Sequence, residues 1–182
     1  MTSRYDDELW ELVPDDPGPP PRALAEFVGA LAPVKRALDL GCGDGRLSEL
    51  LHVDELTIAD VSAVALGRAA RRLPAAHAVE LEPDAPLPLE DGAFDLVLCA
   101  ETIEHVRDVQ LFLSEARRVL RPGGTLALTT PAARTPMRPP APLSPHLRFF
   151  TRRSLARVLD ELGFEVRSLR RTGGSLLVLA GR

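Results

Sequence analysis

The chain has 182 residues, of which 45% are hydrophobic and 26% are charged, a composition typical of a single globular domain. A chain of this length buries roughly 70% of the surface that it exposes when unfolded, so it needs no disulfides or structural metal. No apolar run reaches the roughly 18 residues of a membrane span, and the N-terminus is acidic where a signal peptide is basic. The spacing of Cys42 and Cys99 matches no disulfide scaffold, which is typical of a reducing compartment. We therefore expect a cytoplasmic protein without a membrane span.

Charge is distributed unevenly along the chain. Residues 1–133 contain 12 Arg or Lys and 23 acidic residues, whereas residues 134–182 contain 10 Arg and 3 acidic residues. The basic end could contact an anionic partner. It has no run of stacking aromatic residues such as single-strand binders use, so we favour a solvated surface over a nucleic-acid interface.

Prolines divide the chain, because 11 of the 17 lie in Pro14–Pro21 and Pro131–Pro145. Both segments are predicted to be loops. The first separates an N-terminal segment with its linker, residues 1–21, from a domain formed by residues 22–182. The second is a long loop inside the domain, and we expect it to cover a site.

Between these loops, short apolar runs alternate with segments of helical periodicity, as in a mostly parallel sheet with helices on both faces. The predicted strands are, in chain order, Ala37–Leu40, Leu56–Ala59, Ala78–Leu81, Phe94–Ala100, Thr125–Thr130, Phe164–Leu169 and Ser175–Leu179. The last two are separated by a few residues that include Gly173 and Gly174. A crossover helix does not fit there, so these two strands must pair antiparallel. The sequence predicts a doubly wound, mostly parallel α/β sheet of seven strands, whose last strand is antiparallel.

Four helices are predicted between the strands. The first carries Leu47, Leu50 and Leu51, and the second begins at Ser62, which is placed to cap it. The third runs from Val109 to Leu120 and is ended by a turn at residues 121–124, Arg-Pro-Gly-Gly. The fourth carries its apolar residues from Leu155 to Leu162 and ends at Gly163.

A glycine-rich segment follows the first predicted strand. Residues 39–45 read DLGCGDG, and Gly41 and Gly43 have no Cβ atom that would keep a ligand from the backbone. Asp60 lies nineteen residues after Gly41, at the end of the second strand, where a carboxylate can accept hydrogen bonds from both hydroxyls of a ribose. An adenosine-containing cofactor fits both features.

The chain resembles the class I S-adenosylmethionine-dependent methyltransferases, with most similarity to the small-molecule branch that includes enzymes of ubiquinone and menaquinone biosynthesis. The resemblance covers residues 22–182 and rests on five segments in order: ALDLGCGDGRLSELL, IADVS, PDAPLPLEDGAFDLVLCAETIEHV, LRPGGTLALTTP and HLRFFTRRSL with LGF. It implies a Rossmann-like methyltransferase fold, S-adenosylmethionine as cofactor, S-adenosylhomocysteine as product and a small-molecule acceptor.

The same resemblance implies roles for particular residues. Gly41, Cys42 and Gly43 would line the methionine part of the cofactor, and Asp39 would hold its ammonium group. Asp60 would hold the ribose, and the residues around the adenine and the end of the pocket would be Val61, Asp84, Ala85 and Glu101.

Methyl transfer from a sulfonium chiefly requires that the acceptor be placed in line with the sulfur–methyl bond. A hydroxyl acceptor also needs a base, and His105, just after the fourth strand, is our candidate catalytic residue. A structural role, in which His105 only packs against the helix that follows, stays open.

A metal site is an alternative reading of the same segment. Glu101, Glu104 and His105 share the E-x-x-E-H pattern, and with His146 they resemble the metal site of the small-RNA 3′-terminal 2′-O-methyltransferases. The second histidine and the tryptophan of that family's later motif are missing here, as are its extra RNA-binding parts. We therefore predict a site without metal, and we keep the metal-assisted RNA 3′-end methyltransferase as an alternative function.

Two further alternatives come from other classes of protein. A nicotinamide-dependent oxidoreductase shares the glycine loop and Asp60, but Arg46 stands where its G-x-G-x-x-G fingerprint requires the last glycine. A cofactor-binding domain without catalysis of its own is compatible with every motif above. The N-terminal segment, which holds Tyr5 and Trp10, is predicted to fold over the cofactor as a lid.

Overall fold

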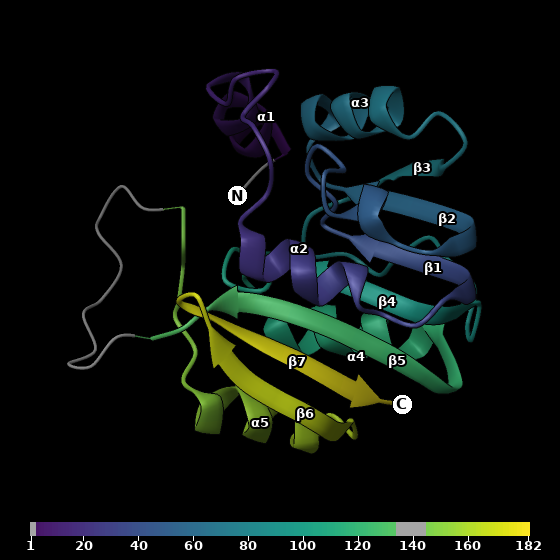
Figure 1. The fold of residues 1–182 in the computed structure, drawn as a ribbon, viewed down its shortest axis with the longest axis vertical. Coiled ribbons are helices and arrows are strands. Elements are labelled where there is room, and N and C mark those ends of the chain that lie inside the picture. The colour runs from purple at the N-terminus through teal and green to yellow at the C-terminus, as the bar shows by residue number, and fades with distance from the viewer. Residues whose placement is uncertain (1–2, 134–144) are drawn as a thin grey trace.

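The computed structural model describes residues 3–133 and 145–182 as one α/β domain (Figure 1). Seven strands form a single sheet in the order β3-β2-β1-β4-β5-β7-β6. The strands are β1 Val34–Leu40, β2 Val53–Asp60, β3 His77–Glu80, β4 Phe94–Ala100, β5 Leu120–Pro131, β6 Glu165–Thr172 and β7 Ser175–Gly181. β7 pairs antiparallel with β5 and β6, whereas the other pairs are parallel. The predicted fold class and the reversed last strand are confirmed.

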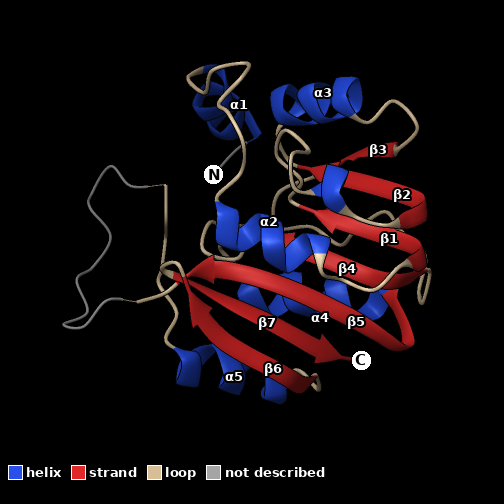
Figure 2. Ribbon diagram, viewed as in Figure 1, coloured by secondary structure: helices blue, strands red, loops and turns tan. Residues whose placement is uncertain are grey.

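Helices cover both faces of this sheet (Figure 2). The helices are α1 Ser3–Glu11, α2 Arg22–Gly29, the 3₁₀ turn η1 Ser48–Leu50, α3 Ala63–Arg72, α4 Val109–Val119 and α5 Arg152–Glu161. α4 and α5 pack on one face, and α2, η1 and α3 pack on the other. No helix in the described part of the chain is long and apolar enough to cross a membrane.

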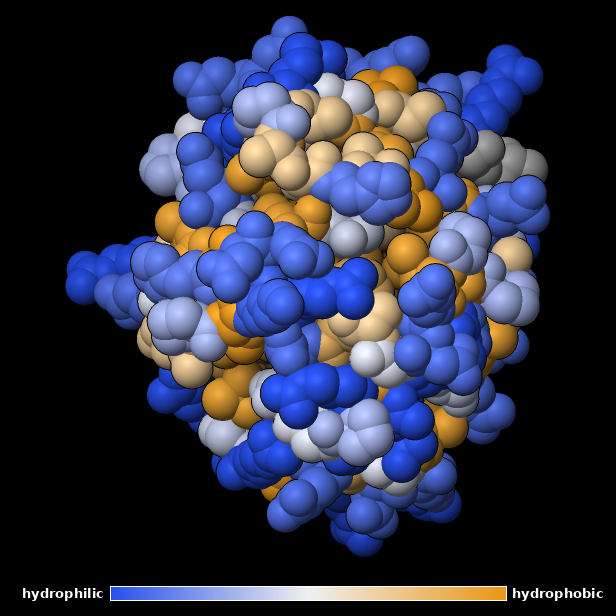
Figure 3. Space-filling view, turned by 90° about the vertical axis from the view of Figure 1, so that its right-hand side faces the viewer, coloured by the Kyte–Doolittle hydropathy of each residue, from blue (hydrophilic) through white to orange (hydrophobic). Residues whose placement is uncertain are grey.

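The central position of β4 in the sheet explains why its sequence is almost continuously apolar. Val97 and Cys99 point into the core under α4 and α5, and Leu96 and Leu98 point into the core under α2. A strand buried on both faces needs apolar side chains at every position. The side of the molecule at which the parallel strands begin is mostly hydrophilic, with smaller groups of hydrophobic residues between the charged ones (Figure 3).

Capping residues account for several helix boundaries, and the sequence predicted two of them, Ser62 and Gly163. The Ser62 hydroxyl accepts a hydrogen bond from the Ala65 N–H at the start of α3, as the sequence predicts. Asp108 caps α4 in the same way, and Thr151 forms a capping box with Ser154 at α5. Gly163, with a φ of +77°, ends α5.

Two expectations were wrong. The predicted helix of Leu47, Leu50 and Leu51 is only the short turn η1, because β2 already begins at Val53, which pairs with Val34 of β1. The three leucines still pack against the core below α2.

The predicted turn at residues 121–124 belongs instead to β5, which begins at Leu120 directly after α4. Leu120 pairs with Phe94, and the register shifts before Thr125 pairs with Leu96. The glycines and the proline therefore form an irregular start of a strand, in which Gly123 has a φ of +78°.

Two more points concern segments outside the regular pattern. α2 was not predicted from the sequence; its Leu24, Phe27 and Val28 are buried against the sheet. Most of the loop expected to cover a site, residues 134–144, lies outside the described residues, so that expectation stays a prediction.

Candidate functional site

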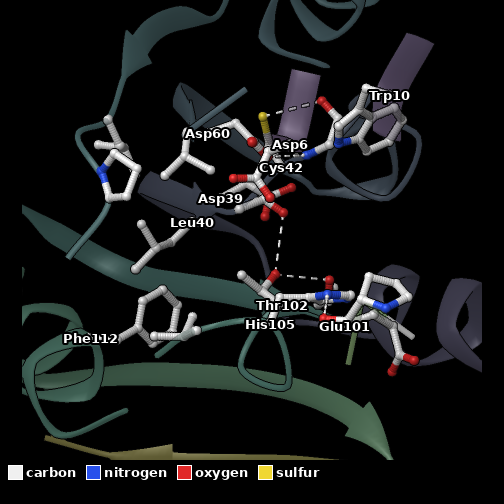
Figure 4. A pocket seen from close by; sticks show the side chains of 18 of the residues that line it. Asp6, Trp10, Asp39, Leu40, Cys42, Asp60, Glu101, Thr102, His105 and Phe112 are labelled. Atoms are coloured by element: carbon white, nitrogen blue, oxygen red, sulfur yellow. Dashed lines mark hydrogen bonds between the residues drawn. The ribbon is translucent and has the colours of Figure 1, made fainter. Parts of the chain in front are cut away.

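A cavity of about 620 Å³ opens at the carboxyl ends of the parallel strands (Figure 4). It lies at the point where the strand order reverses. β2 and β3 lie on one side of β1, and the chain then crosses from β3 to β4 on the other side of β1. Ligands bind at such switch points of open α/β sheets. The cavity is lined by every residue that the sequence assigned to cofactor binding or catalysis: Asp39, Gly41, Cys42, Gly43, Asp60, Val61, Asp84, Ala85, Glu101 and His105.

The loop after β1 has a conformation that only glycine adopts readily. Gly41 has a φ of +80°, and a Cβ atom there would overlap the side chain of Thr102. Gly43 has a φ of +55°, and a Cβ atom there would lie 2.8 Å from the indole ring of Trp10. The N–H groups of Gly41 and Cys42 donate to the Ala59 carbonyl at 2.8 and 3.0 Å, which ties the loop to β2.

Asp60 joins this loop to the start of α3. One of its carboxylate oxygens accepts from the Gly43 N–H at 2.8 Å and the other from the Ser62 N–H at 2.9 Å. Burial raises the pKa of Asp60, and the two backbone hydrogen bonds oppose that shift. Because a carboxylate has about four acceptor positions, Asp60 retains acceptor capacity toward the cavity.

Asp39 is buried at the end of β1, with 2% of its surface exposed. The Ser48 hydroxyl donates to its Oδ2, whereas its Oδ1 has no hydrogen-bond partner in the described part of the molecule. Burial raises the pKa of Asp39 to about 7, since a charged carboxylate loses its hydration there. A buried acceptor without a partner at a cavity wall is suited to a cationic ligand group.

Asp84 and Glu101 share an uncommon backbone conformation. Among the described residues that are not glycine, they are the two with positive φ, at 55° and 52°. Such strain concentrates at functional sites. The Glu101 carboxylate accepts from the Thr129 hydroxyl at 2.9 Å, and burial raises its pKa.

His105 lies on the turn after β4 and lines the cavity. Its Nδ1 lies 3.2 Å from the Pro145 carbonyl, which can only accept, so Nδ1 carries the proton and Nε2 is an acceptor when the ring is neutral. Burial lowers the pKa of His105, and the nearby His146 lowers it further. The ring is therefore neutral at pH 7, as a general base requires.

The structure brings together part of the alternative metal constellation. Ligand atoms of Glu104, His105 and His146 lie within 4.8 Å of one another. The Glu104 carboxylate is buried; its Oε2 accepts from the Thr130 hydroxyl at 2.9 Å, and its Oε1 lies 4.0 Å from His105 Nε2. Burial raises the pKa of Glu104 to about 8. Glu101, which the sequence had placed with them, is not in this group; its carboxylate accepts a hydrogen bond from the Thr129 hydroxyl.

The N-terminal segment forms one wall of the cavity, to which it contributes Asp6, Leu9, Trp10 and Val13. Asp7 Oδ1 accepts from the Ser62 hydroxyl at 2.6 Å and from the Val64 N–H at 3.1 Å, which fastens α1 to the start of α3. Arg68 donates to the Val13 carbonyl and Arg46 to the Gly18 carbonyl.

Sequence reasoning missed two contributions to the cavity. Asp6 lies one helical turn before Trp10, a spacing that could have signalled a shared face. α4 contributes Leu111, Phe112 and Glu115, which the sequence placed in a predicted helix without assigning them to the cavity.

Comparisons with known proteins agree with this arrangement. A family model described as a methyltransferase domain matches residues 13–169. A probable S-adenosylmethionine-dependent methyltransferase of Mycolicibacterium smegmatis is 36% identical over 140 residues, which are 71% of this chain and 51% of that protein. A ubiquinone biosynthesis O-methyltransferase of Chelativorans is 32% identical over 121 residues, 62% of this chain and 45% of that protein. The chain thus spans about half the length of these curated relatives.

Solved structures show the same fold. The (4+2)-cyclase SpnF has a TM-score of 0.81 at 18% identity, with 100% of this chain and 97% of that chain covered. At this identity the likeness concerns the fold alone. With the family model covering most of its length, the chain belongs to the class I S-adenosylmethionine-dependent methyltransferases, whose cofactor is S-adenosylmethionine.

Proposed function

We propose that this protein transfers a methyl group from S-adenosylmethionine to a small-molecule acceptor and releases S-adenosylhomocysteine. The single observation that carries the proposal is the buried Asp39 Oδ1, which has no hydrogen-bond partner among the described residues and lies in the wall of a cavity that the glycine loop also lines. A ligand that brings a cationic group to Asp39 and lies along the loop of Gly41 and Gly43 fits this cavity. The residues present therefore fit this cofactor.

The proposed roles are those that the family resemblance implies, and the positions of the side chains in the cavity support them. Gly41, Cys42 and Gly43 line the methionine part, and Asp39 accepts from the ammonium group. Asp60 accepts from the ribose hydroxyls through the acceptor capacity that its two backbone bonds leave. The adenine lies beside Val61 and meets Asp84 and Ala85 with its amino edge, and Glu101 closes the pocket after β4.

The bound cofactor supplies an already activated methyl group, so the chain mainly has to orient the acceptor and hold its proton. We propose His105 Nε2 as the base that takes a proton from a hydroxyl acceptor, because Nδ1 is engaged by the Pro145 carbonyl. The Glu101 carboxylate in the wall of the pocket accepts a hydrogen bond from the Thr129 hydroxyl.

We also propose the domain division made from the sequence: residues 1–21 as a lid segment with its linker, and residues 22–182 as the catalytic domain. The contacts of Asp7 and Trp10 support the lid, since they link α1 to the start of α3 and to Gly43 of the glycine loop. Deletion of residues 1–13 should weaken binding of S-adenosylhomocysteine, and unchanged affinity would discard this role. The unpaired Cys42 and Cys99 support a reducing, cytoplasmic location.

The experiment that tests the function measures binding and turnover separately. Calorimetry should show binding of S-adenosylmethionine and S-adenosylhomocysteine but not of a nicotinamide dinucleotide. S-adenosylmethionine with a labelled methyl group should then label an acceptor from a panel of phenols, amines, thiols and carbon nucleophiles. Absence of binding would overturn the proposal. Binding without labelling of any acceptor would favour the cofactor-binding domain without its own catalysis.

The cluster of Glu104, His105 and His146 favours one second candidate, a metal-assisted RNA 3′-end 2′-O-methyltransferase. A buried carboxylate oxygen beside two imidazoles suits a divalent cation. A chelator should leave methyl transfer to a small molecule intact. Loss of activity that Mg²⁺ or Mn²⁺ restores, together with labelling of an oligoribonucleotide 3′ end, would replace the first candidate by this one.

A further inference from the structure

α1 brings a carboxylate to the glycine loop that the roles above leave unused. Asp6 and Trp10 are separated by one turn of α1 and line the same cavity as Asp39 and Asp60. Figure 4 shows Asp6 beside Asp60 and Cys42, with Trp10 next to them. The Trp10 ring lies so close to Gly43 that no Cβ atom would fit between them.

Three carboxylates therefore meet in one corner of the cavity. The charge of Asp6 contributes to the raised pKa of Asp60, and that of Asp60 to the raised pKa of Asp39. Burial and the neighbouring Asp7 raise the pKa of Asp6 itself. In the described lining of the cavity, the permanently charged cations are Arg46 and Arg107, and Arg46 is paired with Asp44 at 2.8 Å.

An independent observation indicates that this corner receives a cation. Asp39 Oδ1 is buried without a partner at the cavity wall. A buried, charged oxygen without a hydrogen-bond partner is unfavourable unless a ligand supplies a positive group. α1 is held in place by Asp7 and not by Asp6, so the Asp6 carboxylate is available to a ligand.

We propose that Asp6, supported by the ring of Trp10, is a specificity-determining residue that favours the methyl donor, with its sulfonium charge, over the product, in which that sulfur is neutral. This inference rests on the proposed function. When the methyl group leaves, the electron pair of the sulfur–carbon bond stays on sulfur, so the sulfonium becomes a neutral thioether. The ligand then loses one positive charge and its attraction to Asp6 and to the aromatic ring. This corner of the cavity thereby promotes the replacement of S-adenosylhomocysteine by S-adenosylmethionine.

The test compares three ligands on the full chain at mildly alkaline pH, where Asp6 is ionised. Dissociation constants are measured by calorimetry for S-adenosylmethionine, S-adenosylhomocysteine and sinefungin, which carries an amine in place of the sulfonium methyl. Asp6→Asn should reduce the preference for the two cationic ligands over S-adenosylhomocysteine by about fivefold, the size expected for a partly solvated charge pair. Glu11→Gln, an exposed acid on the same helix, is the matched control and should leave the preference unchanged.

Trp10 gives a second readout, because it is the only tryptophan in the chain. Its fluorescence should become better protected from a soluble quencher when either cationic ligand binds than when S-adenosylhomocysteine binds. Trp10→Phe should retain most of the preference and Trp10→Leu should lose part of it. Equal loss of affinity for all three ligands in Asp6→Asn, or no loss at all, would overturn this inference. Failure of every ligand to bind the wild-type chain would instead overturn the proposed function.

Discussion

Asp60→Asn separates the two tasks of the carboxylate at the end of β2. In the folded protein, its oxygens accept from the N–H groups of Gly43 and Ser62. Asparagine has one acceptor oxygen and so leaves one of these buried N–H groups without a partner, which costs about 1–3 kcal/mol of folding free energy. For a domain of this size, such a loss lowers the melting temperature by a few degrees.

The same substitution removes the charge that we propose holds the ribose hydroxyls. Hydrogen bonds to a charged group contribute about 1.5–3 kcal/mol each, and the loss is partial because asparagine keeps one acceptor. A decrease of about 3 kcal/mol in binding free energy corresponds to a rise in Kd on the order of 100-fold. Calorimetry with S-adenosylhomocysteine measures this change, well below the melting temperature of the variant.

The control is Asp54→Asn, the same substitution near the exposed beginning of β2 and away from the cavity. It should change neither the Kd nor the melting temperature. If Asp60→Asn unfolds cooperatively yet binds S-adenosylhomocysteine with the wild-type Kd, the assignment of Asp60 to the ribose is wrong. If the melting temperature falls but the Kd does not change, Asp60 only stabilises the glycine loop.

Three further predictions concern the base, the buried acid and the arginine that holds the segment between β3 and β4. His105→Ala should lower kcat by about 10²–10⁴-fold with little change in KM, as loss of a general base does; a rise in KM alone would point to substrate packing. Glu104 has a pKa raised from 4.5 to about 8, so the folded state holds a proton that the unfolded chain releases, and wild-type stability should fall as pH rises through this interval. Glu104→Gln should flatten that part of the stability curve in denaturant titrations, and an unaltered slope would assign it to other groups. Arg118 donates to the carbonyls of Leu87 and Leu89 at 2.9 and 2.7 Å. Arg118→Ala should therefore destabilise the domain by about 2–3 kcal/mol and weaken cofactor binding. The control Arg4→Ala, at an exposed residue, should change the free energy of unfolding by less than about 0.5 kcal/mol.

Much of the sheet was predictable because its signals are local. Phe94–Ala100 was predicted with its observed bounds, since a strand buried on both faces reads as one apolar run. The short connection at Gly173 and Gly174 required an antiparallel pair whatever the rest of the chain does. Strand ends were less well predicted: β1 begins three residues before the predicted Ala37, because Lys35 and Arg36 separate Val34 from the apolar run.

The failures have a shared physical cause. The helix predicted at Leu47 has a suitable apolar pattern, but pairing of Val53 with Val34 leaves too few residues for more than one turn. The predicted turn at residues 121–124 has turn-forming residues, yet pairing with β4 draws them into an irregular strand. In both places, tertiary pairing overrode local preference.

The sequence by itself determined the fold class, the glycine loop and the carboxylate at the end of β2, because apolar periodicity and backbone sterics act over a few neighbouring residues. Only the tertiary structure decided which distant groups meet. Asp7 fastens α1 to Ser62, 55 positions away, and the Pro145 carbonyl, 40 positions from His105, engages its Nδ1. Burial, in turn, sets the charge states of Asp39 and Glu104, since the loss of hydration at a side chain depends on everything packed around it.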